Sequence, residues 1–150
     1  MISVRIYRAA RWLHLRRIPA LPWLLKTFNR IVFATVLPPQ ADIAGDILLS
    51  YEGLGTVVNR DAVIHSQAVI GTGVTIGGRS GIQGAPTIGR GAMLGSGSKV
   101  LGPITIGEFA SIGANAVVLA DVPPFGVAVG IPARVVKINR PEDLPDYRDY

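Results

Sequence analysis

Residues 63–78 read VIHSQAVIGTGVTIGG, and in this stretch an isoleucine stands at every sixth position, at Ile64, Ile70 and Ile76. The spacing continues in both directions. Of the twelve positions reached in steps of six between residues 58 and 124, eleven hold Val, Ile or Leu: Val58, Ile64, Ile70, Ile76, Ile82, Ile88, Leu94, Val100, Ile106, Ile112 and Val118, with Pro124 as the twelfth. A period of six is typical neither of an α-helix, which repeats about every 3.6 residues, nor of an alternating half-buried strand.

The residues between these aliphatics explain the period. Four positions after each aliphatic the side chain is mostly small, as at Ala62 and Ala68, and the residue directly after it is often glycine, as at Gly71. A chain that turns a corner every six residues places the large side chain inside and the small one at the corner. We therefore predict an all-β solenoid, a left-handed parallel β-helix of hexapeptide repeats, with about four coils over residues 58–129 that share one core.

The repeat is interrupted at three places. Three extra residues fall within 50–56 (SYEGLGT), and insertions in a solenoid leave it as loops that often carry function. Residues 77–86 (GGRSGIQGAP) keep the frame, but their four glycines and one proline predict irregular backbone with accessible amide groups. After Asp121, prolines end the regular coil, and an apolar strand follows that is tipped by Arg134 and Lys137.

Residues 1–40 carry seven basic side chains and no acidic one. We predict a basic helical arm here, with a break at Pro19 and a second helix that starts at Pro22 and ends near residue 36. The apolar stripe of the first helix is predicted to contain Ile2, Ile6, Ala9 and Leu13. We favour an arm that covers the open end of the β-helix. The alternative is a peripheral membrane contact through residues 1–37, because a basic amphipathic helix with tryptophan also suits an anionic bilayer.

We therefore predict three parts of the chain: the arm (1–40), the β-helix domain (41–137) and a polar C-terminal tail (138–150). The chain has no cysteine, which excludes disulfides and thiolate metal sites, and we expect no metal. The net charge of +5 comes from the arm, so we expect no nucleic-acid partner. Charges interrupt the most apolar window, 18–37, and no signal-peptide pattern is present, so we expect a cytoplasmic protein, peripheral at the inner membrane if the arm binds lipid.

Residues 43–137 resemble the catalytic domain of bacterial serine acetyltransferases, which are hexapeptide-repeat acyltransferases. The motifs that carry the resemblance are YEGLG (51–55), VTIGGRS (74–80), IGANAVV (112–118), DVPP (121–124) and VGIPAR (129–134). The region of Tyr7-Arg8 and Leu21-Pro22 is also similar to the short branch of this family that serves exopolysaccharide and capsule biosynthesis.

The resemblance implies an acetyl-CoA-dependent O-acetyltransferase that forms a homotrimer, with the co-substrate acetyl-CoA in the groove between neighbouring β-helices. The acceptor implied is a small molecule, a hydroxyl of serine or of a sugar in polysaccharide biosynthesis. The residues that the resemblance places at the cofactor are Gly77, Gly78, Arg79, Ser96, Ala114, Leu119, Ala120, Arg134 and Lys137. The charge of Arg134 and Lys137 also suits the phosphates of CoA.

Acyl transfer to a neutral alcohol requires a general base. Serine acetyltransferases place an aspartate and a histidine in the insertion, where this chain has Ser50-Tyr51, and a second histidine before the restart of the repeat, where it has Ala85. The remaining candidates for the base are His65, Tyr51 and Glu52. His65 follows an inward aliphatic and is predicted to point outward, toward a neighbouring subunit's groove. The alternative function is a catalytically degenerate protein that binds acyl-CoA or scaffolds a polysaccharide-synthesis complex.

Overall fold

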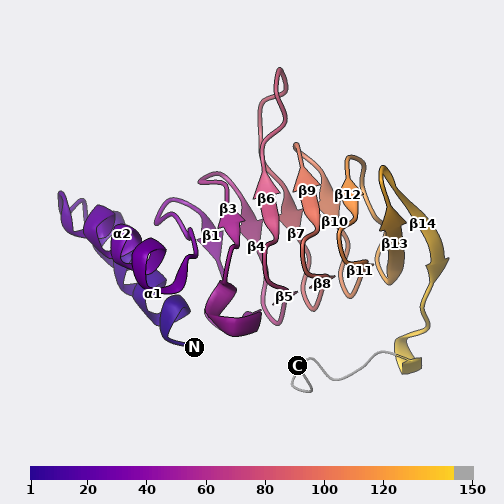
Figure 1. Ribbon diagram of the computed structural model, residues 1–150, viewed down its shortest axis with the longest axis horizontal. Coiled ribbons are helices and arrows are strands. Elements are labelled where there is room, and N and C mark those ends of the chain that lie inside the picture. Colours follow the sequence, from indigo (N-terminus) through magenta and orange to yellow (C-terminus); the bar gives the residue numbers. More distant parts are fainter. Residues whose placement is uncertain (144–150) are drawn as a thin grey trace.

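The computed structural model describes residues 1–143 as a β-helix of short parallel strands with two helices at its N-terminal end (Figure 1). The helical elements are α1 (Ile2–Leu15), α2 (Leu21–Phe33), the 3₁₀ turn η1 (Ser50–Gly53) and η2 (Pro141–Asp143). The strands are β1 (Asp42–Ile43), β2 (Leu48–Leu49), β3 (Val57–Val58), β4 (Val63–Ile64), β5 (Val69–Ile70), β6 (Thr75–Gly77), β7 (Thr87–Ile88), β8 (Met93–Leu94), β9 (Lys99–Leu101), β10 (Thr105–Ile106), β11 (Ser111–Ile112), β12 (Val117–Val118), β13 (Gly126–Gly130) and β14 (Ala133–Ile138).

The strands form three sheets, which the chain visits in turn. We call them the β4 sheet (β1-β4-β7-β10), the β5 sheet (β2-β5-β8-β11-β13-β14) and the β6 sheet (β3-β6-β9-β12). Aliphatics stack in register from coil to coil, as Ile64 does on Ile88 and Ile76 does on Val100. Their side chains are almost completely buried inside the prism. The predicted β-helix of hexapeptide repeats is therefore confirmed.

Three corners separate these sheets, and each is named here by the two sheets that it joins. The β4/β5 corner follows β1, β4, β7 and β10, the β5/β6 corner follows β2, β5, β8 and β11, and the β6/β4 corner follows β3, β6, β9 and β12. Side chains at equivalent positions of successive coils share a corner, because the strands of neighbouring coils pair in parallel and in register. Residues far apart in sequence thereby line one edge of the prism.

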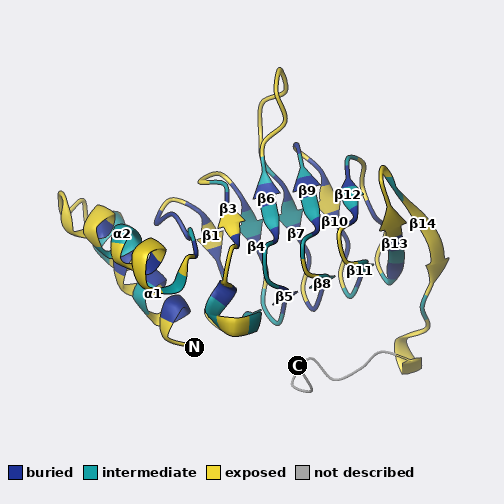
Figure 2. Ribbon diagram, in the orientation of Figure 1, coloured by how far each residue is buried: buried dark blue, intermediate teal, exposed yellow. Residues whose placement is uncertain are grey.

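One of the eleven aliphatics predicted to point inward does not do so. Ile82 is 46% exposed, because residues 78–86 leave the prism as a long loop between β6 and β7 (Figures 1 and 2). The loop adds the length of one hexapeptide, so the aliphatics after it keep the same spacing of six. The inserted hexapeptide itself forms no strand of the prism. Pro124 is exposed, and Val122 and Ala128 occupy the last inward positions, bridging to Ile106 and pairing with Ile112.

Helix α1 packs on the first coil of the β-helix and covers part of its open end. Tyr7 is buried, and its hydroxyl donates a hydrogen bond to the Ala41 carbonyl (2.6 Å) and accepts one from the Ile43 amide (3.1 Å). Arg11 pairs with Asp42 at 2.6 Å. Polar contacts thus fix how α1 is rotated about its axis.

That rotation differs from the predicted one. The buried residues of α1 are Ser3, Val4, Tyr7 and Ala10, whereas Ile2 and Ala9 of the predicted stripe are exposed. Helix α2 ends at Phe33, three residues before the predicted end. No helix within residues 1–143 is both long and apolar enough to cross a membrane.

The C-terminal part of the prism ends in an antiparallel ribbon. Strand β14 turns back on β13, with Arg134 opposite Val129 and Lys137 opposite Val127. Of the predicted polar tail (138–150), Ile138 ends β14, Pro141–Asp143 form η2, and residues 144–150 lie outside the described part of the chain.

Candidate functional site

The first insertion forms η1 on the β5/β6 corner and displays one aromatic side chain. Tyr51 and Glu52 both have left-handed backbone conformations, with φ of 51° and 59°. Such conformations cost roughly 1–3 kcal/mol for a residue with a side chain, and they cluster at functional positions. The Tyr51 side chain is 85% exposed. The strained turn therefore projects a phenol into solvent at this corner.

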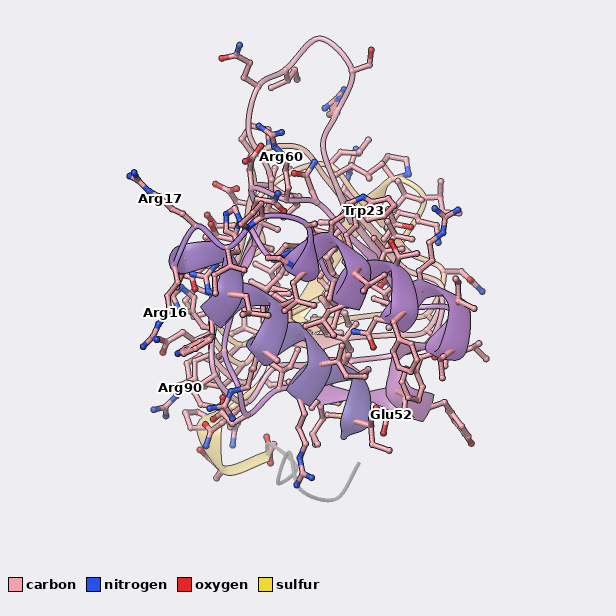
Figure 3. All side chains as sticks on the ribbon, turned by 90° about the vertical axis from the view of Figure 1, so that its left-hand side faces the viewer. Arg16, Arg17, Trp23, Glu52, Arg60 and Arg90 are labelled. Atoms are coloured by element: carbon pink, nitrogen blue, oxygen red, sulfur yellow. The ribbon has the colours of Figure 1, made fainter. Side chains whose placement is uncertain are left out.

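Glu52 points the other way, onto the start of α1 (Figure 3). Its carboxylate accepts hydrogen bonds from the Ile2 amide (3.0 Å), the Ser3 amide (2.8 Å) and the Ser3 hydroxyl (2.7 Å). Burial raises the pKa of Glu52, but these hydrogen bonds and the N-terminal ammonium outweigh it, so the pKa lies below its usual value. A carboxylate held in this way is a poor base, and its evident role is to cap α1.

His65 lies at the β4/β5 corner, directly after β4, and its side chain is exposed. Its backbone amide donates to the Ile88 carbonyl at 2.9 Å, which fixes its place in the ladder. The side chain lines a groove of about 680 Å³ that runs along the outside of the β4 sheet. The other lining residues are Ser66, Thr87, Gly89, Arg90, Thr105, Ile106, Gly107, Glu108, Asp121, Val122, Pro123 and Pro124.

Sequence reasoning missed the charged members of this groove. Arg90 and Glu108 each stand two residues after an inward aliphatic, as Ser66 does after Ile64. The register of the β4 sheet therefore brings these three positions into one row. The hexapeptide period could have predicted this row, because all three residues stand at the same position of successive coils. The row becomes visible only when the hexapeptide inserted with the loop at residues 78–86 is left out of the count.

Of the nine residues predicted to bind the cofactor, seven lie at the two corners that border the β6 sheet. Ser96 and Ala114 are on the β5/β6 corner, in successive coils, on the same corner as Tyr51. Ser96 also lines a smaller hollow of about 220 Å³ on the β5 sheet, together with Ser50.

The second group borders the β6/β4 corner. Gly77 ends β6 and pairs with Leu101, whereas Gly78 and Arg79 begin the long loop, where the Arg79 carbonyl accepts from the Ile82 amide at 3.0 Å. Leu119 and Ala120 follow β12 on the same corner. At this corner, irregular backbone that could contact a cofactor therefore lies beside the strand ends of the β6 sheet.

Two basic residues complete the predicted cofactor set. Arg134 and Lys137 are exposed on β14, at the C-terminal end of the β5 sheet. Among residues 1–143, the guanidinium of Arg134 donates one hydrogen bond, to the carbonyl of its neighbour Ala133 at 3.0 Å, and its other N–H groups have no partner there. These positions suit contacts with an anion that approaches from solvent.

One chain brings some of the predicted site residues together and separates others. Tyr51 shares a corner with Ser96 and Ala114, whereas His65 lies on the one corner that does not border the β6 sheet. Within one chain, His65 therefore does not face the predicted cofactor residues. In residues 1–143 no three His, Cys, Asp or Glu side chains gather as ligands for a metal ion.

Comparisons with known proteins agree with this fold. The family model described as bacterial transferase hexapeptide (six repeats) matches residues 85–120. The serine acetyltransferase of Synechococcus elongatus is 39% identical over 72 residues, which cover 48% of this chain and 29% of the relative.

Two solved structures extend the likeness. A serine acetyltransferase in complex with cysteine is 33% identical, with a TM-score of 0.88 over 99% of this chain and 58% of that one. The Brucella abortus serine acetyltransferase in complex with coenzyme A is 30% identical, with a TM-score of 0.85 over 92% and 56%. The chain thus spans little more than half the length of these structures. It is a hexapeptide-repeat protein with a serine acetyltransferase-like structure, and its place in the polysaccharide branch stays a prediction.

Proposed function

We propose that this chain is an acetyl-CoA-dependent O-acetyltransferase. The observation that carries the proposal is its likeness, over 92% of its length, to a serine acetyltransferase in complex with coenzyme A. The matched length takes in most of the prism, where the predicted cofactor residues flank the β6 sheet. The acceptor that we propose is the hydroxyl of serine or of a sugar used in polysaccharide synthesis.

A trimer would complete this site. The predicted cofactor residues lie on two different corners of one prism, and His65 lies on the third. Packing three prisms side by side places a corner of one chain against a neighbour, so that one chain supplies the cofactor edge and the next supplies the base. We propose that acetyl-CoA lies in such a groove, with Arg134 and Lys137 near its phosphates.

In the proposed reaction, the base takes the proton of the acceptor hydroxyl while its oxygen attacks the thioester carbonyl carbon. The carbon–sulfur bond then breaks, and the thiolate of CoA receives the proton. We assign the base to His65, because imidazole is the side chain whose ordinary pKa is nearest to neutral. Tyr51 is the alternative, because it shares a corner with Ser96 and Ala114.

The test is a thiol-release assay with serine, simple sugars and nucleotide sugars as acceptors. His65→Ala is expected to lower kcat by about 10²–10⁴-fold with little change in acetyl-CoA affinity. Tyr51→Phe is the matched comparison, and a loss confined to Tyr51→Phe would move the base to η1. Full activity in both variants would refute both assignments.

The trimeric arrangement has its own test. Arg134→Ala is expected to weaken acetyl-CoA binding while it leaves His65 intact. Co-expression of His65→Ala and Arg134→Ala chains then creates some grooves with both residues intact, so activity should partly return. If co-expressed chains are no more active than the two single variants, base and cofactor do not come from different chains.

A second function is favoured by the state of the candidate bases. Glu52 is bound to α1, and His65 is separated from the cofactor edges of its own chain. A protein that binds acyl-CoA without transferring the acyl group, as part of a polysaccharide-synthesis complex, would have this arrangement. Acetyl-CoA binding without turnover on any of the acceptors would favour this second function.

A further inference from the structure

Helix α2 faces outward with its apolar side. The buried residues of this helix are Pro22 and Asn29, and the Asn29 side-chain amide donates to the Ser3 carbonyl at 2.9 Å. By contrast, Leu24 is 57% exposed, Phe28 50% and Ile31 77%. These positions, with Val32, fall on one stripe of a helix. Most of the large apolar side chains of α2 therefore face outward.

The helices that carry this stripe hold basic and no acidic side chains, and of these Arg11 is paired with Asp42. All seven charged side chains of residues 1–40 are positive: Arg5, Arg8, Arg11, Arg16, Arg17, Lys26 and Arg30. Trp23 is 66% exposed and lies on the flank of the stripe that also holds Arg30. Figure 3 looks onto this end of the molecule, where Arg16 and Arg17 extend from the edge of the helix pair. The guanidinium of Arg16 lies 3.8 Å from the centre of the Trp12 ring.

We propose that this end face, formed by α1 and α2, docks on the surface of an anionic lipid bilayer. The apolar stripe of α2 enters the boundary between headgroups and acyl chains, the tryptophans lie at that boundary, and the arginines meet lipid phosphates. Because α1 and α2 are too short and too charged to span, they lie along the surface. The β-helix then stands away from the membrane.

The charge distribution favours lipid over a second copy of this chain. Two copies that meet through this face would bring two acid-free basic surfaces together, and like charges at such a contact oppose association. An anionic bilayer complements the charge and the apolar stripe at the same time.

The helix pair is also held in place before any lipid arrives. Tyr7 and Glu52 tie α1 to the first coil through the hydrogen bonds described above, and Asn29 ties α2 to α1. A preorganised surface loses less conformational entropy on binding than a disordered segment that folds on the membrane. The exposed stripe is therefore ready for contact.

Vesicle flotation of the full chain tests the proposal. We expect the protein to float with vesicles of phosphatidylcholine and phosphatidylserine, to bind phosphatidylcholine alone much more weakly, and to be released by high salt. Each of Leu24→Gln and Ile31→Gln should weaken binding about tenfold or more. The matched control is Val136→Gln, because Val136 is 61% exposed at the other end of the prism.

Substitutions of arginines and the fluorescence of Trp23 complete the experiment. Arg16→Gln with Arg17→Gln should weaken binding to anionic vesicles, whereas Arg60→Gln, on an exposed arginine of the β-helix, should not. In a Trp12→Phe background Trp23 is the remaining tryptophan, and its emission should shift to the blue with anionic vesicles.

Three outcomes would overturn the proposal. The first is the absence of flotation with anionic vesicles, and the second is an equal loss of binding in Val136→Gln. The third is association of the protein with itself, seen by light scattering and removed by Ile31→Gln, without any lipid binding. Unchanged unfolding temperatures of the variants would show that their folds are intact, which we expect because the substituted side chains are exposed.

Discussion

Replacing Ile88 by alanine tests the stacked core, and replacing Ile82 supplies its control. Both residues stand at the same phase of the hexapeptide period, but Ile88 is 0% exposed in β7 and Ile82 is 46% exposed in the long loop. Ile88 is paired on one side with Ile64 and on the other with Ile106. The coils above and below are held by backbone hydrogen bonds, so they cannot close over a cavity.

The magnitude follows from this packing. Losing three buried carbon atoms costs about 2.4 kcal/mol in transfer free energy, and the cavity brings the total to about 3–5 kcal/mol. In a chain of this size the unfolding temperature should fall by about 6–20 °C. Ile82→Ala should change the free energy of unfolding by less than about 0.5 kcal/mol.

The assay is chemical and thermal unfolding of the two variants beside the wild-type chain, followed by circular dichroism. Equal destabilisation by both substitutions would refute the placement of the loop outside the prism. A loss below about 1 kcal/mol for Ile88→Ala would refute the stacked core itself.

Three further substitutions test individual contacts. Because the pKa of Glu52 is lowered on folding, its carboxylate stabilises α1 fully above the unfolded-state pKa of about 4.3 and loses that effect as the pH falls through the folded-state value. The protection factors of the α1 amides, taken relative to an unstructured peptide at the same pH, should therefore fall in acid, and Glu52→Gln should lower them at neutral pH and flatten their pH dependence. Tyr7→Phe removes a buried hydroxyl that makes two hydrogen bonds and should cost about 1–3 kcal/mol in denaturant unfolding. In Gly95→Ala the new Cβ would lie 2.6 Å from the Ala114 amide nitrogen, so we expect a loss of about 1–3 kcal/mol by thermal unfolding. The loss should be smaller in Gly78→Ala, where the nearest atom to the new Cβ is the Asn59 Nδ2 at 3.4 Å.

The period of six predicts the prism because each coil repeats one steric requirement, a large side chain inside and a small one at the corner. It mislocates Ile82 for the same reason, since an insertion of one full repeat leaves the phase of all later positions unchanged. The positive φ angles of Gly81 and Gly84 mark that loop, and the density of glycine there is the sequence signal. Beyond the prolines, the last inward positions follow the paired strands, with Ala128 beside Ile112.

The arm and the site depend on contacts that no period records. The rotation of α1 is set by Tyr7 and by Glu52, which caps the helix from 49 residues away. Helical periodicity depends on the helix alone, so it predicts the wrong buried face for α1, and it gives no sign that Glu52, one of three candidate bases, binds this helix instead. Likewise, the groove beside His65 forms from coils up to 60 residues apart, and its charged lining becomes evident only once the coils are stacked.

The most direct test of the central proposal is calorimetric titration of the intact chain with acetyl-CoA and with CoA. We predict saturable binding of one acetyl-CoA per chain. Arg134→Ala and Lys137→Ala should lower the affinity for acetyl-CoA more than the control Arg60→Ala does. Absence of any binding heat across the accessible concentrations, together with no protection against thermal unfolding, would contradict both the acetyltransferase and the acyl-CoA-binding alternative.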